Sequence, residues 1–309
     1  MIEKIIDSCQ YVVNNSKHVS IDYHKIDDII KNIDCSNLKF WLADNPYDLF
    51  SLGISNVVNF LLIFESIDYS FWGNPKWTIA TDDGKKDGSD ALLYALLKYV
   101  KEKNSTDFSN VPFDEFCEIL KGNTDIPLLK ERYNTVVEVS NIVNDQMDGN
   151  FYQHIKNITT DTDLLHLIIT KFPSFQDIRE YDGKTIYFYK LAQLLVSDIL
   201  HMREFLENIS VDYTNLLGCA DYKIPQTLRA LEIVKYDVEL SEIVDNKNEI
   251  AISSVYEVEI RASMLIVINY IQNKMKNVNA IDINDYLFLL AKKIKLDTKP
   301  YHLCRNTNY

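Results

Sequence analysis

The chain has 309 residues, of which 47% are hydrophobic, and it carries a formal net charge of −13 at pH 7. This hydrophobic fraction is typical of a globular protein with a substantial core. The strong negative charge argues against a protein that binds polyanionic nucleic acid. With 8 glycines and 7 prolines, the sequence offers little material for flexible linkers or for the many tight turns of an all-β fold. A chain of this length could form one large domain or two, and composition marks no boundary between them.

The cysteines indicate reduced thiols rather than a disulfide framework or a zinc site. There are 5 of them, scattered without a CxxC pair, and the 6 histidines show no HExxH spacing. The amino terminus carries Glu3 and Lys4 before an amphipathic pattern, unlike a signal peptide. The longest apolar run, around 57–64, is too short to span a bilayer. We therefore expect a cytoplasmic protein with no membrane partner, metal or cofactor.

Apolar residues repeat at three- and four-residue steps along most of the chain, which predicts helices. The segment 91–100 follows Ser89–Asp90, a suitable helix cap, and the segment 164–169 is stopped by Pro173. The other predicted helices cover 26–33, 191–200, 264–271 and 287–294.

Strand signals are weak. Residues 76–80 precede an Asp-Asp-Gly turn and predict a short hairpin arm, whereas 184–189 is compatible with a strand or with the entry to a helix. We predict a mainly α fold with room for one small β-ribbon.

One carboxylate lies among small and apolar residues in the segment 218–226, Gly-Cys-Ala-Asp-Tyr-Lys-Ile-Pro-Gln. Ile224 precedes Pro225 and is therefore biased away from the α conformation. We expect Asp221 at a turn leading into a helix whose first turn holds Pro225. On this spacing alone, a helix cap or a buried, hydrogen-bonded Asp is the commoner interpretation. A partly buried carboxylate is also typical of functional sites.

Two further segments concentrate aromatic side chains beside turns. Residues 70–75 contain Trp72 and follow Asp68, and residues 172–177 contain Phe175. Such rings can stack on a flat heterocycle, although a hydrophobic lid over the core is the commoner use.

Several charged residues have two open interpretations. Lys190 begins an otherwise apolar helix, with Asp198 two turns later on the same face, and it could hold a phosphate or pair with a carboxylate. Glu257 and Arg261 stand at i and i+4, the order that favours a helical ion pair, while the arginine is also a candidate for binding phosphate. His302 belongs to a cationic, aromatic carboxyl-terminal tail that could dock across the domain.

Taken in order, these segments resemble the queuosine salvage family of queuosine 5′-phosphate N-glycosylase/hydrolases. The family landmarks read approximately NFxFW, FPSFxD, KRAQ, FADYRxPQ, ExEIR, IDYYLWD and PxHRxR. They correspond to residues 68–72, 172–177, 190–193, 219–226, 257–261, 283–289 and 300–305. The shared order, continuing to the carboxyl terminus, makes the resemblance specific where no single match would be.

The resemblance implies a single, mainly helical domain over residues 1–309, related in shape to helix-hairpin-helix DNA glycosylases. It also implies hydrolysis of the N-glycosidic bond of queuosine 5′-phosphate or queuosine, which releases the 7-deazaguanine base queuine for salvage into tRNA modification. Asp221 would be the nucleophile or would stabilise an oxocarbenium-like state. The implied or candidate substrate-binding residues are Cys219, Asn284, Asp285, Leu289, Lys190, Tyr222, Asp68, Trp72, Phe175, Arg261 and His302.

The sequence departs from the family pattern at positions that bear on the substrate. Cys219 replaces an aromatic residue, and Leu191 replaces an arginine. An ungapped alignment of the acidic motif puts Asn284 at its first Asp and Leu289 at its last, whereas a shift of one residue restores an Asp-Tyr pair at 285–286. Either alignment loses one acid facing the base. A non-catalytic protein that binds a modified nucleobase remains the alternative, and the charge disfavours a glycosylase acting on a nucleic-acid polymer.

Overall fold

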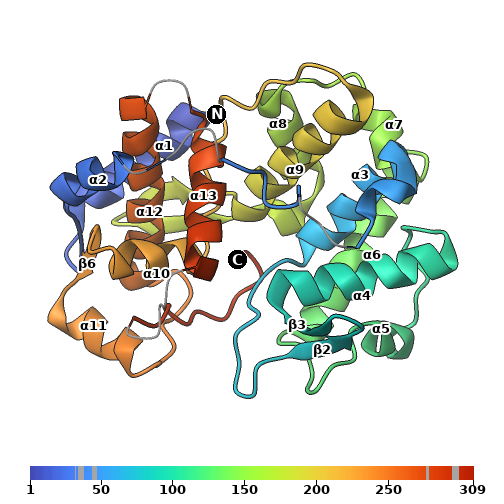
Figure 1. The fold of residues 1–309 in the computed structure, drawn as a ribbon, viewed down its shortest axis with the longest axis horizontal. Coiled ribbons are helices and arrows are strands. Elements are labelled where there is room, and N and C mark those ends of the chain that lie inside the picture. Colours follow the sequence, from blue (N-terminus) through green and yellow to red (C-terminus); the bar gives the residue numbers. More distant parts are fainter. Residues whose placement is uncertain (32, 34–37, 44–46, 276–277, 294–298) are drawn as a thin grey trace.

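The computed structural model describes the chain except residues 32, 34–37, 44–46, 276–277 and 294–298. Its helices form two groups that lie side by side (Figure 1). The group made from the two ends of the chain is called the terminal group. It consists of α1 (Ile2–Asn15), α2 (Tyr23–Ile30), α10 (Lys223–Ala230), α11 (Val238–Asp245), α12 (Val255–Met275) and α13 (Ala280–Lys293). Helix α12 contacts α1, α2, α10 and α13 and is the centre of this group.

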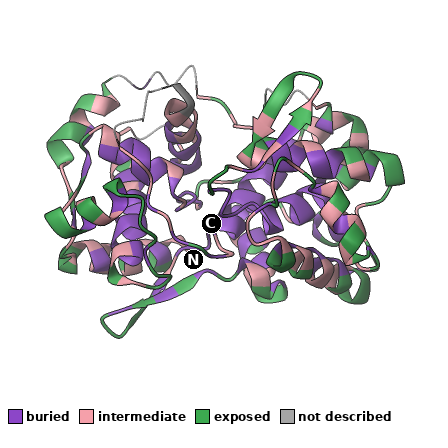
Figure 2. Cartoon of the chain, turned by 90° about the horizontal axis from the view of Figure 1, so that it is seen from below, coloured by how far each residue is buried: buried purple, intermediate pink, exposed green. Residues whose placement is uncertain are grey.

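The central group is built around α3 (Gly53–Ser66), which packs against α9 (Lys190–Glu207). The remaining helices of the group are α4 (Gly88–Lys103), α5 (Phe113–Ile119), α6 (Leu129–Gln146), α7 (Phe151–Ile155) and α8 (Asp161–Lys171). Residues 57–66 of α3 are all buried. Figure 2 shows largely purple interiors in both halves of the molecule. The segment Leu49–Ser66 is long and apolar enough to cross a membrane by length and composition. A core helix meets the same criteria, and here α3 is enclosed by α4, α6, α7 and α9.

Three antiparallel two-stranded ribbons occur in the described part of the chain, where the sequence predicted one. They pair β1 (Val19–Ile21) with β6 (Val234–Tyr236), β2 (Thr78–Thr81) with β3 (Gly84–Asp87), and β4 (Ile178–Tyr181) with β5 (Lys184–Tyr187). The predicted hairpin arm is β2, and the ambiguous segment 184–189 begins as a strand. Ribbon β1–β6 joins distant parts of the sequence, which a local pattern does not reveal.

The mainly helical fold is confirmed, and each predicted helix falls on an observed one. The predicted stop of the helix over 164–169 is also confirmed, since α8 ends at Lys171. Residue Ile294, at the end of the prediction for α13, lies outside the described residues. The cap predicted for α4 was wrong: the helix begins at Gly88 with Asp87 as N-cap, because it follows β3 directly. Ser89 instead donates a hydrogen bond to Oδ1 of Asp68 at 2.6 Å.

The carboxyl-terminal tail docks between the two groups, as expected. The carbonyl of Leu303 accepts the amide of Ile250 at 2.8 Å, beside α12, and the carbonyl of Tyr309 accepts the amide of Ser70 at 3.0 Å, just after α3. Figure 2 shows the C-terminus between the halves of the molecule. The tail therefore connects the terminal group to the central group.

Candidate active site

A cavity of about 220 Å³ lies where the two groups and the tail meet. The central group contributes the segment 68–76, the start of α4 and the first turns of α9. The terminal group contributes the loop 219–224 and the inner face of α13, and the tail contributes Tyr301 and Tyr309. The cavity thus draws its walls from segments far apart in the sequence.

The loop that carries Asp221 depends on a glycine. Gly218 has φ +142°, and a Cβ atom there would lie 3.0 Å from Cδ1 of Ile268 and 3.2 Å from Oδ1 of Asn284. Gln193 of α9 holds the same loop, because its Oε1 accepts the amides of Leu217 at 2.8 Å and Gly218 at 3.2 Å. The backbone therefore passes close to α12, α13 and α9 just before it reaches Asp221.

Asp221 combines both interpretations that the sequence left open. Its Oδ1 accepts the amides of Lys223 at 2.9 Å and Ile224 at 3.1 Å, so it caps the first turn of α10, and Pro225 lies in that turn as predicted. Its carboxyl group also lines the cavity. Within the described part of the chain, no donor reaches Oδ2. Burial raises the pKa of Asp221, and the positive charge of Lys190 opposes that rise.

Lys190 pairs with a carboxylate. Its Nζ donates to the carbonyl oxygen of Asp68 at 2.9 Å and to Oδ2 of the same residue at 3.2 Å. Burial alone would lower the pKa of Lys190, but the negative charge of Asp68 is the main cause that raises it above its ordinary value, so the ammonium group stays charged. Both Lys190 and Asp68 line the cavity and place one cation near Asp221.

Asn284 and Asp285 connect the loop of Asp221 to α13. Oδ1 of Asn284 accepts the amide of Cys219 at 2.8 Å, and its Nδ2 donates to Oδ1 of Asp285 at 3.2 Å. All three residues line the cavity. Burial raises the pKa of Asp285 to about 7, although its hydrogen bonds oppose the rise, so this carboxyl group titrates near neutrality.

Trp41 also lines the cavity, although the sequence did not single it out. Its backbone amide donates to Oδ2 of Asp285 at 3.1 Å, and its indole Nε1 donates to Oδ1 of Asp198 at 3.0 Å. Trp41 precedes the first predicted helix of the central group and belongs to no motif. The one available signal was Asp198, an acid within an apolar helix that needs a buried partner.

Two other predicted positions lie in the cavity wall, namely Trp72 and Tyr222. Trp72 is 4% exposed, and the guanidinium of Arg305 lies over its ring, 4.2 Å from the ring centroid. Tyr222 packs against Tyr301 with ring centroids 4.9 Å apart. Both therefore lie beneath other side chains of the tail.

The structure places Leu289, Phe175, Arg261 and His302 outside the cavity lining. Leu289 lies on α13 beyond the lining position Phe288. Phe175 is buried against Phe172, with ring centroids 6.0 Å apart. Burial lowers the pKa of His302 to about 3, and its Nε2 lies 3.4 Å from the Tyr309 hydroxyl.

The guanidinium of Arg261 is bound by protein groups rather than facing the cavity. It is fully buried and pairs with Glu257 at 3.2 Å, which confirms the predicted helical ion pair. It also donates to Oδ1 of Asp177 at 3.0 Å and to the carbonyl of Ala220 at 2.8 Å. Arg261 therefore supports the loop next to Asp221 from behind.

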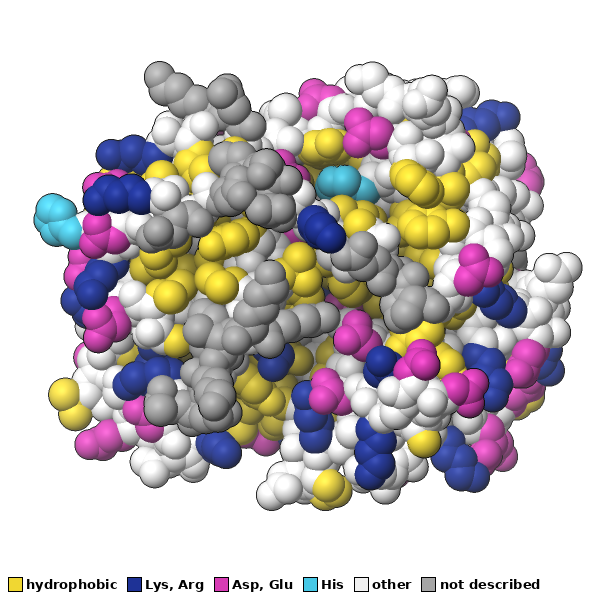
Figure 3. Space-filling view, viewed as in Figure 1, with side chains coloured by type: hydrophobic (Ala, Val, Ile, Leu, Met, Phe, Trp, Pro, Cys, Tyr) yellow, Lys and Arg dark blue, Asp and Glu magenta, His cyan; other side chains and the backbone are white. Residues whose placement is uncertain are grey.

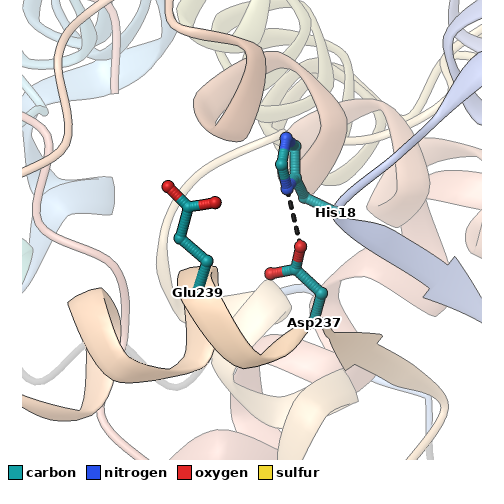
Figure 4. A group of neighbouring side chains, drawn as sticks. All are labelled: His18, Asp237 and Glu239. Atoms are coloured by element: carbon teal, nitrogen blue, oxygen red, sulfur yellow. Dashed lines mark hydrogen bonds and ion pairs between the residues drawn. The ribbon is translucent and has the colours of Figure 1, made fainter.

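One group of side chains has the composition of a metal site. The ligand atoms of His18, Asp237 and Glu239 lie within 4.8 Å of one another (Figure 4). Nδ1 of His18 is 2.7 Å from Oδ2 of Asp237, Oδ1 of Asp237 accepts the amide of Leu240, and Glu239 accepts the hydroxyl of Tyr256. These protein partners account for the arrangement, and none of the three residues lines the cavity.

Comparison with known proteins identifies the family of this chain. Residues 51–309 match the family model for the queuosine salvage protein. A Sphaerobacter thermophilus protein named queuosine 5′-phosphate N-glycosylase/hydrolase is 28% identical, covering 83% of both chains. Two further relatives have the same name. The one from Bos taurus is 28% identical, covering 82% of this chain and 81% of its own, and the one from Mus musculus is 25% identical, covering 98% of both chains. The chain belongs to the queuosine salvage protein family.

Proposed function

We propose that this chain hydrolyses the N-glycosidic bond of queuosine 5′-phosphate, or of queuosine, and releases queuine for salvage. The observation that carries the proposal is the carboxyl group of Asp221. One of its oxygens is fixed by two amides of α10, while the group as a whole lines the cavity. The names of the relatives give the same activity.

Asp221 is the group we assign to the sugar. Breaking the bond between ribose and base builds positive charge on the anomeric carbon, and a fixed carboxylate can stabilise that charge or attack the carbon. In the second case, water then hydrolyses the glycosyl ester and restores the carboxylate. The two amide hydrogen bonds prevent the carboxyl group from rotating away, so little reorganisation is needed during the reaction.

Asp285 is the group we assign to the departing base. A 7-deazapurine lacks N7, the usual protonation site of a leaving purine, so the base must be assisted elsewhere. With a pKa raised to about 7, Asp285 is substantially protonated near neutral pH and can donate a hydrogen bond to the base. Its position in the cavity wall beside Asn284 offers a polar edge next to apolar side chains.

The remaining parts of the proposal concern the whole molecule. Because the cavity takes walls from both helix groups, we propose that residues 1–309 act as one domain, related in shape to helix-hairpin-helix DNA glycosylases and located in the cytoplasm. A small-molecule substrate fits the net charge of −13. On the face shown in Figure 3, Lys and Arg side chains are interspersed with Asp and Glu, unlike a surface for a polyanion.

The test is to incubate the purified protein with queuosine 5′-phosphate and, separately, with queuosine, and to measure free queuine by chromatography. Guanosine 5′-phosphate serves as the control substrate. We expect queuine from at least one of the first two. Tight binding of queuine without release from either would instead support a non-catalytic nucleobase-binding protein.

A further inference from the structure

We propose that the indole of Trp41 is the surface on which the base of the substrate stacks, and that Asp198, paired with Glu65, fixes the orientation of this ring. This inference rests on the proposed function and extends it to the residue that recognises the flat base. Trp41 lies outside the segment 51–309 that matches the family model.

Both hydrogen-bond donors of Trp41 already bond to protein acceptors. The backbone amide donates to Asp285 at 3.1 Å and the indole Nε1 donates to Asp198 at 3.0 Å. With these two donors occupied, Trp41 can offer a ligand mainly the apolar surface of its ring. A flat heterocycle that stacks on the indole is the ligand chemistry that matches such a surface.

The acceptor of the indole hydrogen belongs to a buried pair of acids. The side chain of Asp198 is fully buried next to that of Glu65, and burial raises the pKa of both. If both were ionised, Oδ2 of Asp198 and both oxygens of Glu65 would have no donor. A single proton on Glu65 lets it donate to Asp198, which then remains a carboxylate and a strong acceptor for the indole.

The segment carrying Trp41 is held on both sides by aromatic contacts. Phe40 stacks on His201 of α9, with ring centroids 4.5 Å apart and an interplanar angle of 5°. The indole itself packs on Phe64 at 6.3 Å and meets the edge of Phe288 at 6.2 Å. Trp41 is therefore positioned by both packing and hydrogen bonds, and the ring has a fixed place in the wall.

Most other rings that line the cavity are buried beneath a cation or another ring. Arg305 lies over Trp72, Arg132 over Tyr69, and Arg261 over Tyr309, each within 4.4 Å of the ring centroid. These three rings are at most 4% exposed, whereas Trp41, like Phe288 and Tyr301 in the same wall, is partly exposed. This difference favours Trp41 as a ring available to a ligand.

Trp41 is also connected to Cys219 through hydrogen bonds. At the position of Cys219 the family resemblance leads one to expect an aromatic residue. The amide of Cys219 bonds to Asn284, Asn284 bonds to Asp285, and Asp285 accepts the amide of Trp41. A continuous series of hydrogen bonds therefore sets Trp41 relative to the loop of Asp221. The indole can supply the aromatic surface that Cys219 lacks.

The first test measures equilibrium binding of two free bases, queuine and 7-deazaguanine, by calorimetry. We expect Trp41→Ala to weaken both by about tenfold to a hundredfold, as expected for loss of one stacking contact. Trp41→Phe should lose less affinity than Trp41→Ala. Phe205→Ala, which removes an exposed ring on α9, should bind the bases like the wild type. Unchanged binding of both bases by Trp41→Ala would overturn the proposal. Loss confined to queuine would also overturn it, because the ring would then contact the side chain of queuine rather than its base.

The second test examines Asp198 as a positioning residue. Asp198→Asn keeps an acceptor for the indole and an amide donor for Glu65, so we expect base binding close to that of the wild type. Asp198→Leu removes the acceptor and should weaken binding about tenfold, with Glu204→Gln on the same helix as the control. In the background of Trp41→Phe, which has no indole hydrogen, Asp198→Leu should cause no further loss. A full additional loss there, measured on folded protein, would show that Asp198 acts through general stability and would contradict its role.

The two proposals fail in different ways. If the wild type releases queuine but Trp41→Ala binds bases normally, the inference about Trp41 falls and the hydrolase assignment stands. If the wild type binds both bases through Trp41 yet releases none, the stacking surface stands and the hydrolase assignment falls.

Discussion

Oδ1 of Asp221 accepts the amide of Lys223 at 2.9 Å, so the same carboxyl group both lines the cavity and caps α10. The two roles can be separated by substitution. An asparagine retains an oxygen acceptor for the cap but has no negative charge for the sugar. Stability and activity should therefore respond differently at this position.

We expect Asp221→Asn to lower kcat for queuine release by at least about a hundredfold, with a free energy of unfolding within about 1 kcal/mol of the wild type. Asp221→Ala should lose the activity and also about 1 kcal/mol of stability, because the cap is removed. Queuine release and urea unfolding measure the two effects. The control is Asp237→Asn, because Asp237 caps α11 and lies away from the cavity. Wild-type turnover by Asp221→Asn would exclude the catalytic assignment.

The turn at Asp221 illustrates what the sequence could predict. The Ile-Pro step and the small residues around the acid are local signals, and they located both the turn and the start of α10. Another local signal, the i, i+4 spacing, identified the helical ion pair of Glu257 and Arg261. Local signals of this kind could not show that Arg261 turns away from the cavity, since that depends on Asp177, which reaches it from a distant segment.

Trp41 and the ribbon β1–β6 were missed for the same reason. Neither has a periodic pattern of its own, and each owes its position to residues far along the chain, Asp198 and Asp285 for the tryptophan and residues 234–236 for β1. Non-local pairing of this kind is decided by packing and by the need to satisfy buried polar groups.

The pH dependence of activity should report Asp285. Its pKa is raised to about 7, so the protonated form that can donate to the base is lost as pH rises through neutrality. We expect kcat/KM, which reports groups of the free enzyme, to fall above about pH 7 in the wild type. Asp285→Asn, whose amide cannot titrate, should be slower than the wild type at pH 6. Its activity should show no fall between pH 6 and 9. A wild-type profile that is flat between pH 6 and 9 would contradict the assignment of Asp285 to the base.

The same group should make stability depend on pH. A carboxyl group whose pKa is raised in the folded state binds its proton more tightly there than in the unfolded chain. The stabilisation is fully present below about pH 4 and is lost as pH rises through about 7. We expect Asp285→Asn to be more stable than the wild type at pH 8, by up to a few kcal/mol, and to lose that advantage near pH 4. Glu204→Gln, an exposed acid on α9, is the control, and thermal unfolding across the pH range measures the difference.

Gly218 should be intolerant of a side chain. Alanine there would place its Cβ 3.0 Å from Ile268 and 3.2 Å from Asn284, on a backbone with φ +142°. We expect Gly218→Ala to destabilise the fold by about 1–3 kcal/mol and to reduce queuine release, because the loop must shift next to Asp221. The matched control is Gly183→Ala, whose φ is +74° but whose Cβ would meet nothing within 4 Å. Equal effects of the two substitutions on activity would show that the close approach at Gly218 is unimportant.

Arg261 should be essential for stability and for the position of Asp221. Removing it by Arg261→Met leaves the two buried carboxylates of Asp177 and Glu257 with Arg179 as the one cation among the described residues that pairs with both. It also takes the donor from the carbonyl of Ala220. The expected loss is about 3–5 kcal/mol. Lys121→Met, which breaks an exposed pair with Glu118, should have no measurable effect.

Arg261→Lys provides the finer test of this arginine. A lysine retains the charge but cannot bond to Asp177, Glu257 and Ala220 with the geometry of a guanidinium. We therefore expect a protein that folds with reduced stability and has a lower kcat, because Ala220 adjoins Asp221. Both quantities can be measured on the same preparation by thermal unfolding and queuine release. Wild-type kcat in a destabilised Arg261→Lys protein would show that Arg261 supports the fold without positioning the catalytic loop.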